Sequence, residues 1–175
     1  MGIVEPPGDD QQRETASAAM EQFEQAYKLS DELGRDAMLP YLGKVAFAAG
    51  ETEKAKKYAN MMLDETGANK DWNSGNKTHS GHLLLGQIAL AEGNVDQAKE
   101  RLLKAARTKG SPQLNSFGPN MQLAKALLEE GETEAVLECF ELCRDFWSMG
   151  EKKLDAWETA VAAGDVPDFG ANLRY

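Results

Sequence analysis

The feature that most constrains this chain is a helical pattern that stops at a glycine four times along the sequence and starts again after the first three. The turn glycines are Gly50, Gly93, Gly131 and Gly164, which lie 43, 38 and 33 residues apart. A glycine after a helix adopts the left-handed conformation without a Cβ penalty, and an Asn, Thr or Asp behind it can cap the next helix. The pattern therefore predicts antiparallel helix pairs that stack as a solenoid.

We expect an all-α fold, a right-handed α-solenoid of about eight helices, in which a carboxy-terminal helix caps the stack. The first helix should end at Gly34, the second should hold Pro40 in its first turn, and the sixth should begin at Pro119. The expected division is a disordered leader (1–10), one helical-repeat domain (11–166) and an extended tail (167–175). Within the domain we place repeats near 36–69, 79–112 and 117–150 and a capping helix at 151–163.

Charge and hydropathy narrow the class of partner. The net charge of −10 argues against a nucleic-acid binder, whose affinity depends on neutralising phosphates. No apolar run approaches the roughly 20 residues of a membrane helix, and Met1 to Pro7 lack the pattern of a signal peptide, so we expect no membrane contact and a cytoplasmic location. The charge is −5 over residues 1–35, +2 over 36–110 and −7 over 111–175, so the middle repels an acidic partner least.

The residues that could carry chemistry are few. His79 and His82 lie three apart on a predicted helix and could begin a metal site, but no acidic or cysteine ligand follows at a suitable spacing, which favours a packed histidine. Cys139 and Cys143, four apart on another predicted helix, are expected to be buried. We therefore predict no catalytic residues, no metal and no cofactor. Of the two longest loops, 67–78 and 110–118, the first holds Trp72, either exposed or folded back as a lid.

The second helix pair carries the packing residues of a known repeat. Counted over 34 positions from His79, the large and small packing positions of the tetratricopeptide repeat fall on Leu85, Gly86, Ala89, Ala98, Leu102 and Ala105. The first pair matches at Leu42, Gly43, Ala46 and Ala55, and the third at Leu123, Ala124, Leu127 and Phe140. The chain thus resembles a tetratricopeptide repeat protein with degenerate repeats over about residues 36–147.

The resemblance implies where a partner would bind. In this family the first helices of the pairs line a concave groove that holds a peptide or a partner helix. Carried onto this chain, the groove residues are Lys44, Phe47, Leu83, Gln87, Leu90, Met121, Lys125 and Leu128. Leu83 and Leu90 have an alternative interpretation as packed core.

The leading hypothesis is a non-catalytic protein-protein interaction or scaffold module that binds a peptide or partner helix in the concave groove. One alternative is a self-associating structural repeat protein, a homo-oligomer, because the first helix has no matching partner upstream. Another is a regulatory domain excised from a larger protein, such as an enzyme.

Overall fold

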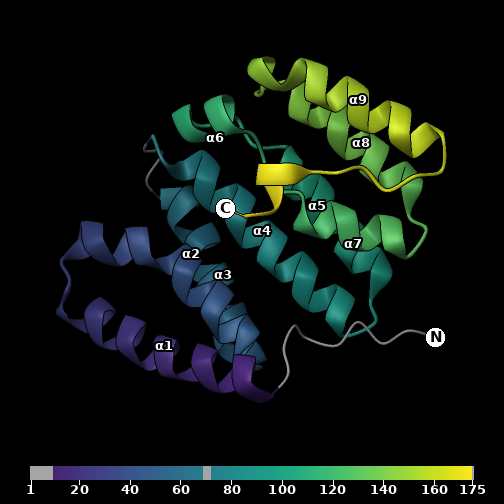
Figure 1. Cartoon of the computed structure of the whole chain (residues 1–175). Helices are drawn as coiled ribbons and strands as arrows, with labels where there is room; N and C mark the ends of the chain where they lie inside the picture. The colour runs from purple at the N-terminus through teal and green to yellow at the C-terminus, as the bar shows by residue number, and fades with distance from the viewer. Residues whose placement is uncertain (1–9, 69–71, 175) are drawn as a thin grey trace.

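The computed structural model describes residues 10–68 and 72–174, which form nine α-helices and two short 3-10 helices with no strand among them (Figure 1). The all-α prediction is therefore confirmed. The helices are α1 (Asp10–Leu29), α2 (Glu32–Ala48), α3 (Thr52–Ala68), α4 (Ser74–Ala91), α5 (Val95–Ala106), α6 (Pro112–Phe117), α7 (Gln122–Glu129), α8 (Thr133–Arg144), η1 (Ser148–Gly150), α9 (Glu151–Ala162) and η2 (Gly170–Leu173). The predicted leader lies outside the described residues except for Asp10, the first residue of α1.

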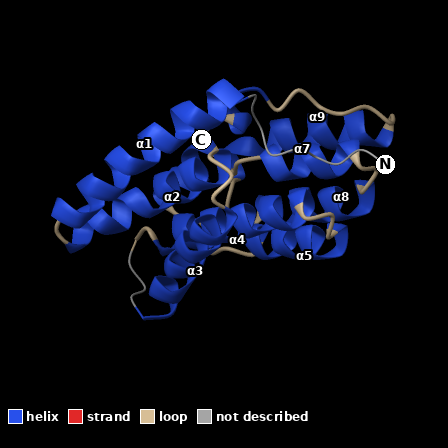
Figure 2. Ribbon diagram, turned by 90° about the horizontal axis from the view of Figure 1, so that it is seen from below, coloured by secondary structure: helices blue, strands red, loops and turns tan. Residues whose placement is uncertain are grey.

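Each helix packs mainly on its neighbours in the chain. From α1 to α5, every helix lies against the next one, and α5 then contacts α7 and α8, while α8 contacts α9. Figure 1 and Figure 2 place α1 at one end of the molecule and α9 at the other. The outward face of α1 is polar, with Glu14, Glu21 and Gln25 exposed, while Met20 is buried against the core, so α1 covers one end of the helix stack.

The same turn ends four of the helices. Gly50, Gly93, Gly131 and Gly164 have φ angles of 79°, 78°, 87° and 87°, which confirms the predicted left-handed conformation. Behind each glycine, the next amide donates a hydrogen bond to a carbonyl five residues earlier, which closes the last helical turn. These bonds are Glu51 to Ala46, Asn94 to Ala89, Glu132 to Leu127 and Asp165 to Ala160, at 2.8–2.9 Å. The Asn94 side chain also accepts from the amide of Gln97 and so caps α5 as predicted.

Two glycines inside helices receive a leucine from the first helix of the next pair. A Cβ on Gly43 of α2 would lie 2.5 Å from Leu84 Cδ2 of α4. A Cβ on Gly86 of α4 would collide with Leu123 Cδ2 of α7 and lie 3.1 Å from Arg101 Cβ of α5. Successive first helices therefore meet through the same kind of contact, a leucine packed on bare backbone.

Ion pairs also recur between one pair and the turn of the next. Lys56 Nζ of α3 lies 2.7 Å from Glu92 Oε1, beside the Gly93 turn. Lys99 Nζ of α5 lies 2.9 Å from Glu132 Oε2, beside the Gly131 turn. Both lysines are the fifth residue of their helix, so the two bridges occupy equivalent places.

The interior consists of two apolar clusters that share α4. Leu84 and Ile88 of α4 join the cluster made by α1, α2 and α3. Leu83, Ala89 and Leu90 join the larger cluster made by α5, α7, α8 and α9. Because α4 lies between the two clusters, it is apolar on opposite faces rather than along one stripe.

The start of α2 differs from the prediction. Gly34 does not end the first helix, which stops at Leu29; instead α2 begins at Glu32 and runs through both Gly34 and Pro40. Asp31 makes this start possible, because its carboxylate accepts the amide of Gly34 at 2.9 Å and caps the helix. Pro40 therefore lies inside α2 and not in its first turn. A proline inside a helix costs stability, and the burial of the nearby Leu39 and Leu42 offsets that cost.

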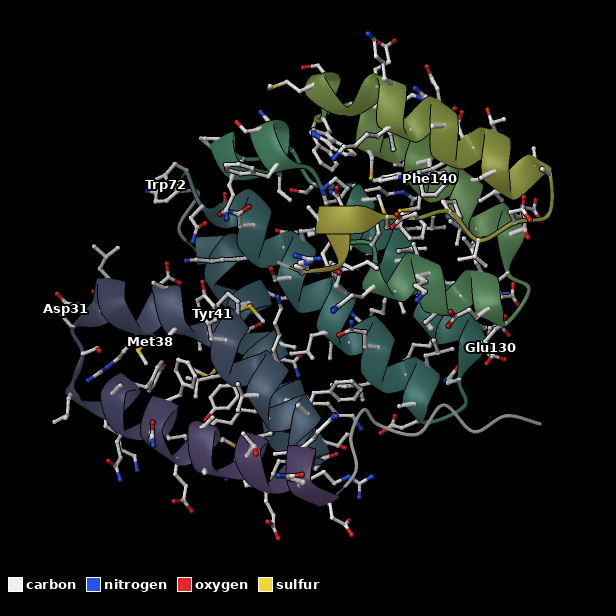
Figure 3. All side chains as sticks on the ribbon, viewed as in Figure 1. Asp31, Met38, Tyr41, Trp72, Glu130 and Phe140 are labelled. Carbon is white, nitrogen blue, oxygen red and sulfur yellow. The ribbon has the colours of Figure 1, made fainter. Side chains whose placement is uncertain are left out.

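Several other boundaries also move. The expected loop at 67–78 is shorter, since α3 runs through Gly67 and α4 begins at Ser74, and Trp72 is 69% exposed rather than folded back as a lid (Figure 3). The expected loop at 110–118 contains α6, capped by the Ser111 hydroxyl. Pro119 precedes α7, which begins only at Gln122.

The tail is not simply extended along the surface. It runs back from α9 without regular structure to Phe169 and ends in η2. Phe169 and Asn172 are both buried, the latter fully. Long-range contacts with α7, α8 and α9 therefore hold the tail, which local sequence patterns do not encode.

The contact of Gly86 with α5 and α7 generates a stability prediction. Gly86→Val should lower the free energy of unfolding by about 1–3 kcal/mol, because the branched side chain must displace Leu123 and press on Arg101. Gly86→Ala should cause a smaller loss, because only the end of the Leu123 side chain has to move. Thermal and urea melts of both variants beside the parent chain measure this effect.

The control is Gln97→Val at an exposed position of α5, which changes helix propensity without a packing clash. A Gly86→Val chain as stable as the parent would contradict the close packing of α4 on α5 and α7.

Candidate functional site

The predicted groove residues divide into a buried set and a surface set. Leu83, Leu90 and Met121 are core side chains. Phe47 and Leu128 are half-buried and pack against the two clusters. The polar members, Lys44, Gln87 and Lys125, reach the surface.

The burial of the first set has a physical cause. Leu83 and Leu90 lie on the side of α4 that faces α5 and α7, so the alternative interpretation as packed core describes them. Met121 precedes α7, and its amide donates a hydrogen bond to the carbonyl of Asn172 in the tail at 2.8 Å. A partner can therefore meet the polar members of the predicted groove, while these three side chains serve the interior.

The three polar members lie at equivalent places on α2, α4 and α7. We call Lys44, Gln87 and Lys125 the polar row. Gln87 Nε2 donates to Gln122 Oε1 at 3.2 Å, which joins α4 to α7. Lys125 Nζ lies 3.7 Å from Glu129 Oε1, one turn along the same helix. Gln87 and Lys125 of the polar row thus each interact with a neighbouring side chain.

Lys44 is the exception within the row. It is exposed, and within the described residues it forms no salt bridge or side-chain hydrogen bond. Desolvation by surrounding protein nevertheless lowers the pKa of its ammonium group from the usual 10.5. Lys44 therefore offers a partly desolvated cation with which no carboxylate of the described residues pairs.

His79 connects α4 to two later parts of the chain. Its Nδ1 lies 3.0 Å from the carbonyl of Ala105, and its Nε2 accepts the amide of Asn120 at 3.1 Å. This pairing requires the neutral tautomer with the proton on Nδ1. Burial, opposed by the hydrogen bond to Ala105 and helped by the positive charge of Lys44, lowers the pKa of His79 to about 4.

Neither histidine is arranged for a metal. Both ring nitrogens of His79 already have hydrogen-bond partners. His82 Nδ1 lies 3.3 Å from Arg101 Nη1. Burial and the positive charge of Arg101 lower the pKa of His82 to about 4. No group of three or more His, Cys, Asp or Glu side chains suited to a metal occurs within residues 10–68 and 72–174. The two histidines instead pack α4 against its neighbours.

The two cysteines are buried in the core as predicted. A hydrogen bond with Cys139, together with burial, raises the pKa of Cys143 well above its usual value. The Cys143 thiol therefore stays protonated and lacks the thiolate that nucleophilic chemistry requires.

A small cavity of about 170 Å³ opens between α8 and α9, lined by Arg144, Trp147, Ser148 and Glu151. The Arg144 guanidinium forms ion pairs with Asp155 at 2.9 Å and Glu158 at 2.7 Å, and these pairs hold α9 on α8. Its charge is therefore neutralised within the protein, and the cavity has no free cation with which to hold an anionic ligand.

Comparison of the chain with protein families, with curated proteins and with solved structures finds no match. The tetratricopeptide resemblance accordingly stays a prediction that rests on the residues themselves. Among the helices of the described segments, none is long and apolar enough to cross a membrane.

The buried His79 generates a prediction for acid stability. Unfolded chains take up a proton on this histidine near pH 6.5, whereas the folded chain does so only near pH 4. Between these values the unfolded state binds more protons, so the free energy of unfolding should fall as the pH falls, by about 3 kcal/mol in all. Urea denaturation at several pH values across this window measures the slope.

His79→Gln keeps a donor and an acceptor but does not titrate, so its stability should depend less on pH over the same window. His82→Gln serves as the comparison for the half-buried neighbour. An unchanged slope in His79→Gln would show that other groups cause the acid sensitivity.

Proposed function

We propose that this chain is a non-catalytic interaction module of the tetratricopeptide type, which binds an acidic segment of a partner protein along the polar row. The observation that carries the proposal is Lys44, an exposed and partly desolvated cation without a counter-ion in the described residues. Its place on α2 is the place where the resemblance expects partner contacts.

The repetitive packing supports the solenoid part of the proposal. Four turns share one glycine cap, two glycines each receive a leucine of the next pair, and two lysines bridge to the next turn in the same way. In a solenoid each unit contacts mainly its neighbours, so identical contacts recur from pair to pair.

The chemistry of the row supports an acidic partner. A carboxylate that approaches Lys44 replaces hydration that the ammonium group has already lost in part, so the ion pair forms at a lower desolvation cost than one on a convex surface. The half-buried Phe47, three residues on, offers an apolar contact one helical turn away. A partner segment that alternates acidic and apolar residues at helical spacing fits this pair of contacts.

Charge reversal tests the proposal with a defined probe. A short fluorescein-labelled peptide of Glu and Leu residues at helical spacing is titrated with the chain, and anisotropy reports binding. Lys44→Glu should raise the dissociation constant about tenfold, which corresponds to about 1.4 kcal/mol. Binding should also weaken as salt is added, because salt screens the ion pair.

Lys57→Glu is the matched control, since it makes the same charge change on an exposed residue of α3 outside the row. The proposal fails if the peptide does not bind the parent chain, or if Lys57→Glu weakens binding as much as Lys44→Glu. The latter result would indicate attraction by net charge alone.

A further inference from the structure

The segment behind α9 docks on the folded chain as a peptide ligand does. After Gly164 it runs back across α8 and α7, as Figure 1 shows. Pro167, Phe169 and Asn172 are buried, while the residues between them are exposed. We call these buried side chains anchors. Anchors at such intervals, separated by exposed residues, are typical of an extended peptide whose side chains enter pockets of its partner.

The first anchor is aromatic. The ring of Phe169 lies 5.0 Å from that of Trp157 on α9 and 6.2 Å from that of Phe140 on α8, with edge-to-face angles in both cases. Figure 3 shows Phe140 on α8 beside the returning segment. The Trp157 indole Nε1 also donates to the carbonyl of Asp168 at 3.3 Å. Such pairs contribute beyond the area that they bury.

The second anchor is an asparagine whose polar groups all have partners. Asn172 Nδ2 donates to the carbonyls of Phe117 at 3.2 Å and Pro119 at 2.9 Å, and its Oδ1 accepts from Lys153 Nζ at 3.3 Å. Its own carbonyl accepts the amide of Met121 at 2.8 Å. These partners favour asparagine at this position, because its amide supplies both the two donors and the acceptor. An aspartate would instead place an oxygen against two carbonyl oxygens.

A third contact holds the end of the segment from α7. Gln122 Nε2 donates to the carbonyl of Leu173 at 2.9 Å, and Gln122 Oε1 accepts a hydrogen bond from Gln87 of α4. The site thus recognises the main chain at three carbonyls and the side chains at two anchors. All of its groups come from residues before position 160, so the site precedes the segment that fills it.

We propose that α7, α8 and α9 form a peptide-recognition site that this chain fills in cis with residues 167–174. The partner that fits it is a segment with a phenylalanine three residues before an asparagine, in the pattern Pro-x-Phe-x-x-Asn. This inference goes beyond the acidic-segment function, because none of its contacts involves Lys44. Such a segment binds when the cis occupant leaves, so the docked tail limits access to the site.

The test uses the full chain and a labelled peptide of its own tail sequence, Asp-Val-Pro-Asp-Phe-Gly-Ala-Asn-Leu-Arg. Asn172→Asp weakens the cis occupant without a change of shape, so the variant should bind the peptide at least tenfold more tightly than the parent. The same peptide with Asp in place of its Asn should bind neither chain. Ala171→Ser, an exposed change in the same segment, should behave as the parent.

Equal affinity of the parent and Asn172→Asp for the peptide, or no binding to either, overturns the inference and makes the tail a fixed part of the core. If circular dichroism shows that Asn172→Asp does not fold, Phe169→Leu replaces it, since this change weakens an anchor of the tail and leaves the groups of the site intact. Phe169→Leu should then bind the peptide more tightly than the parent, and a parent-like affinity overturns the inference. Lys44→Glu should leave peptide binding unchanged, which separates this result from the test of the polar row.

Discussion

A glycine in the left-handed conformation ends four helices of this protein in the same way, and the rest of the structure depends on that reversal. The closing amide-to-carbonyl bond satisfies a carbonyl that would otherwise lack a partner and turns the chain back along the helix that it has just left. Behind Gly50, Gly93 and Gly131 the reversal places the next helix against the previous one, α3 on α2, α5 on α4 and α8 on α7. The leucines that pack on Gly43 and Gly86 then bring successive first helices into close contact.

The central helix α4 shows what such stacking requires of a chain. It is buried on both sides, and two of its buried polar groups have specific partners there: Lys77 Nζ lies 2.5 Å from Asp36 Oδ1 of α2, and His79 joins α5 to the segment before α7. A buried charge or imidazole without a partner costs several kcal/mol. These contacts therefore favour one arrangement of α2, α4 and α7 over alternatives with the same apolar packing.

The two proposed binding sites meet at α7 and rely on different chemistry. Lys44 on α2 offers a partly desolvated cation, and the tail site on α7 to α9 offers aromatic rings and fixed hydrogen-bond partners. Gln122 connects the two regions, because it binds both Gln87 of the polar row and the carbonyl of Leu173. Release of the tail would free this amide and lengthen the polar surface that begins at Lys44.

The sequence by itself determined the helical class, the glycine turns and the Asn94 cap, because each depends on residues a few positions apart. Only the tertiary structure decided that α2 continues through Gly34 and Pro40, that Leu83, Leu90 and Met121 are core, and that Phe169 and Asn172 dock the tail. It also decided that Lys44 of the predicted groove has no carboxylate partner in the described residues. The reason is physical: caps and periodicity are local, whereas burial and ion pairing depend on segments that only folding brings together.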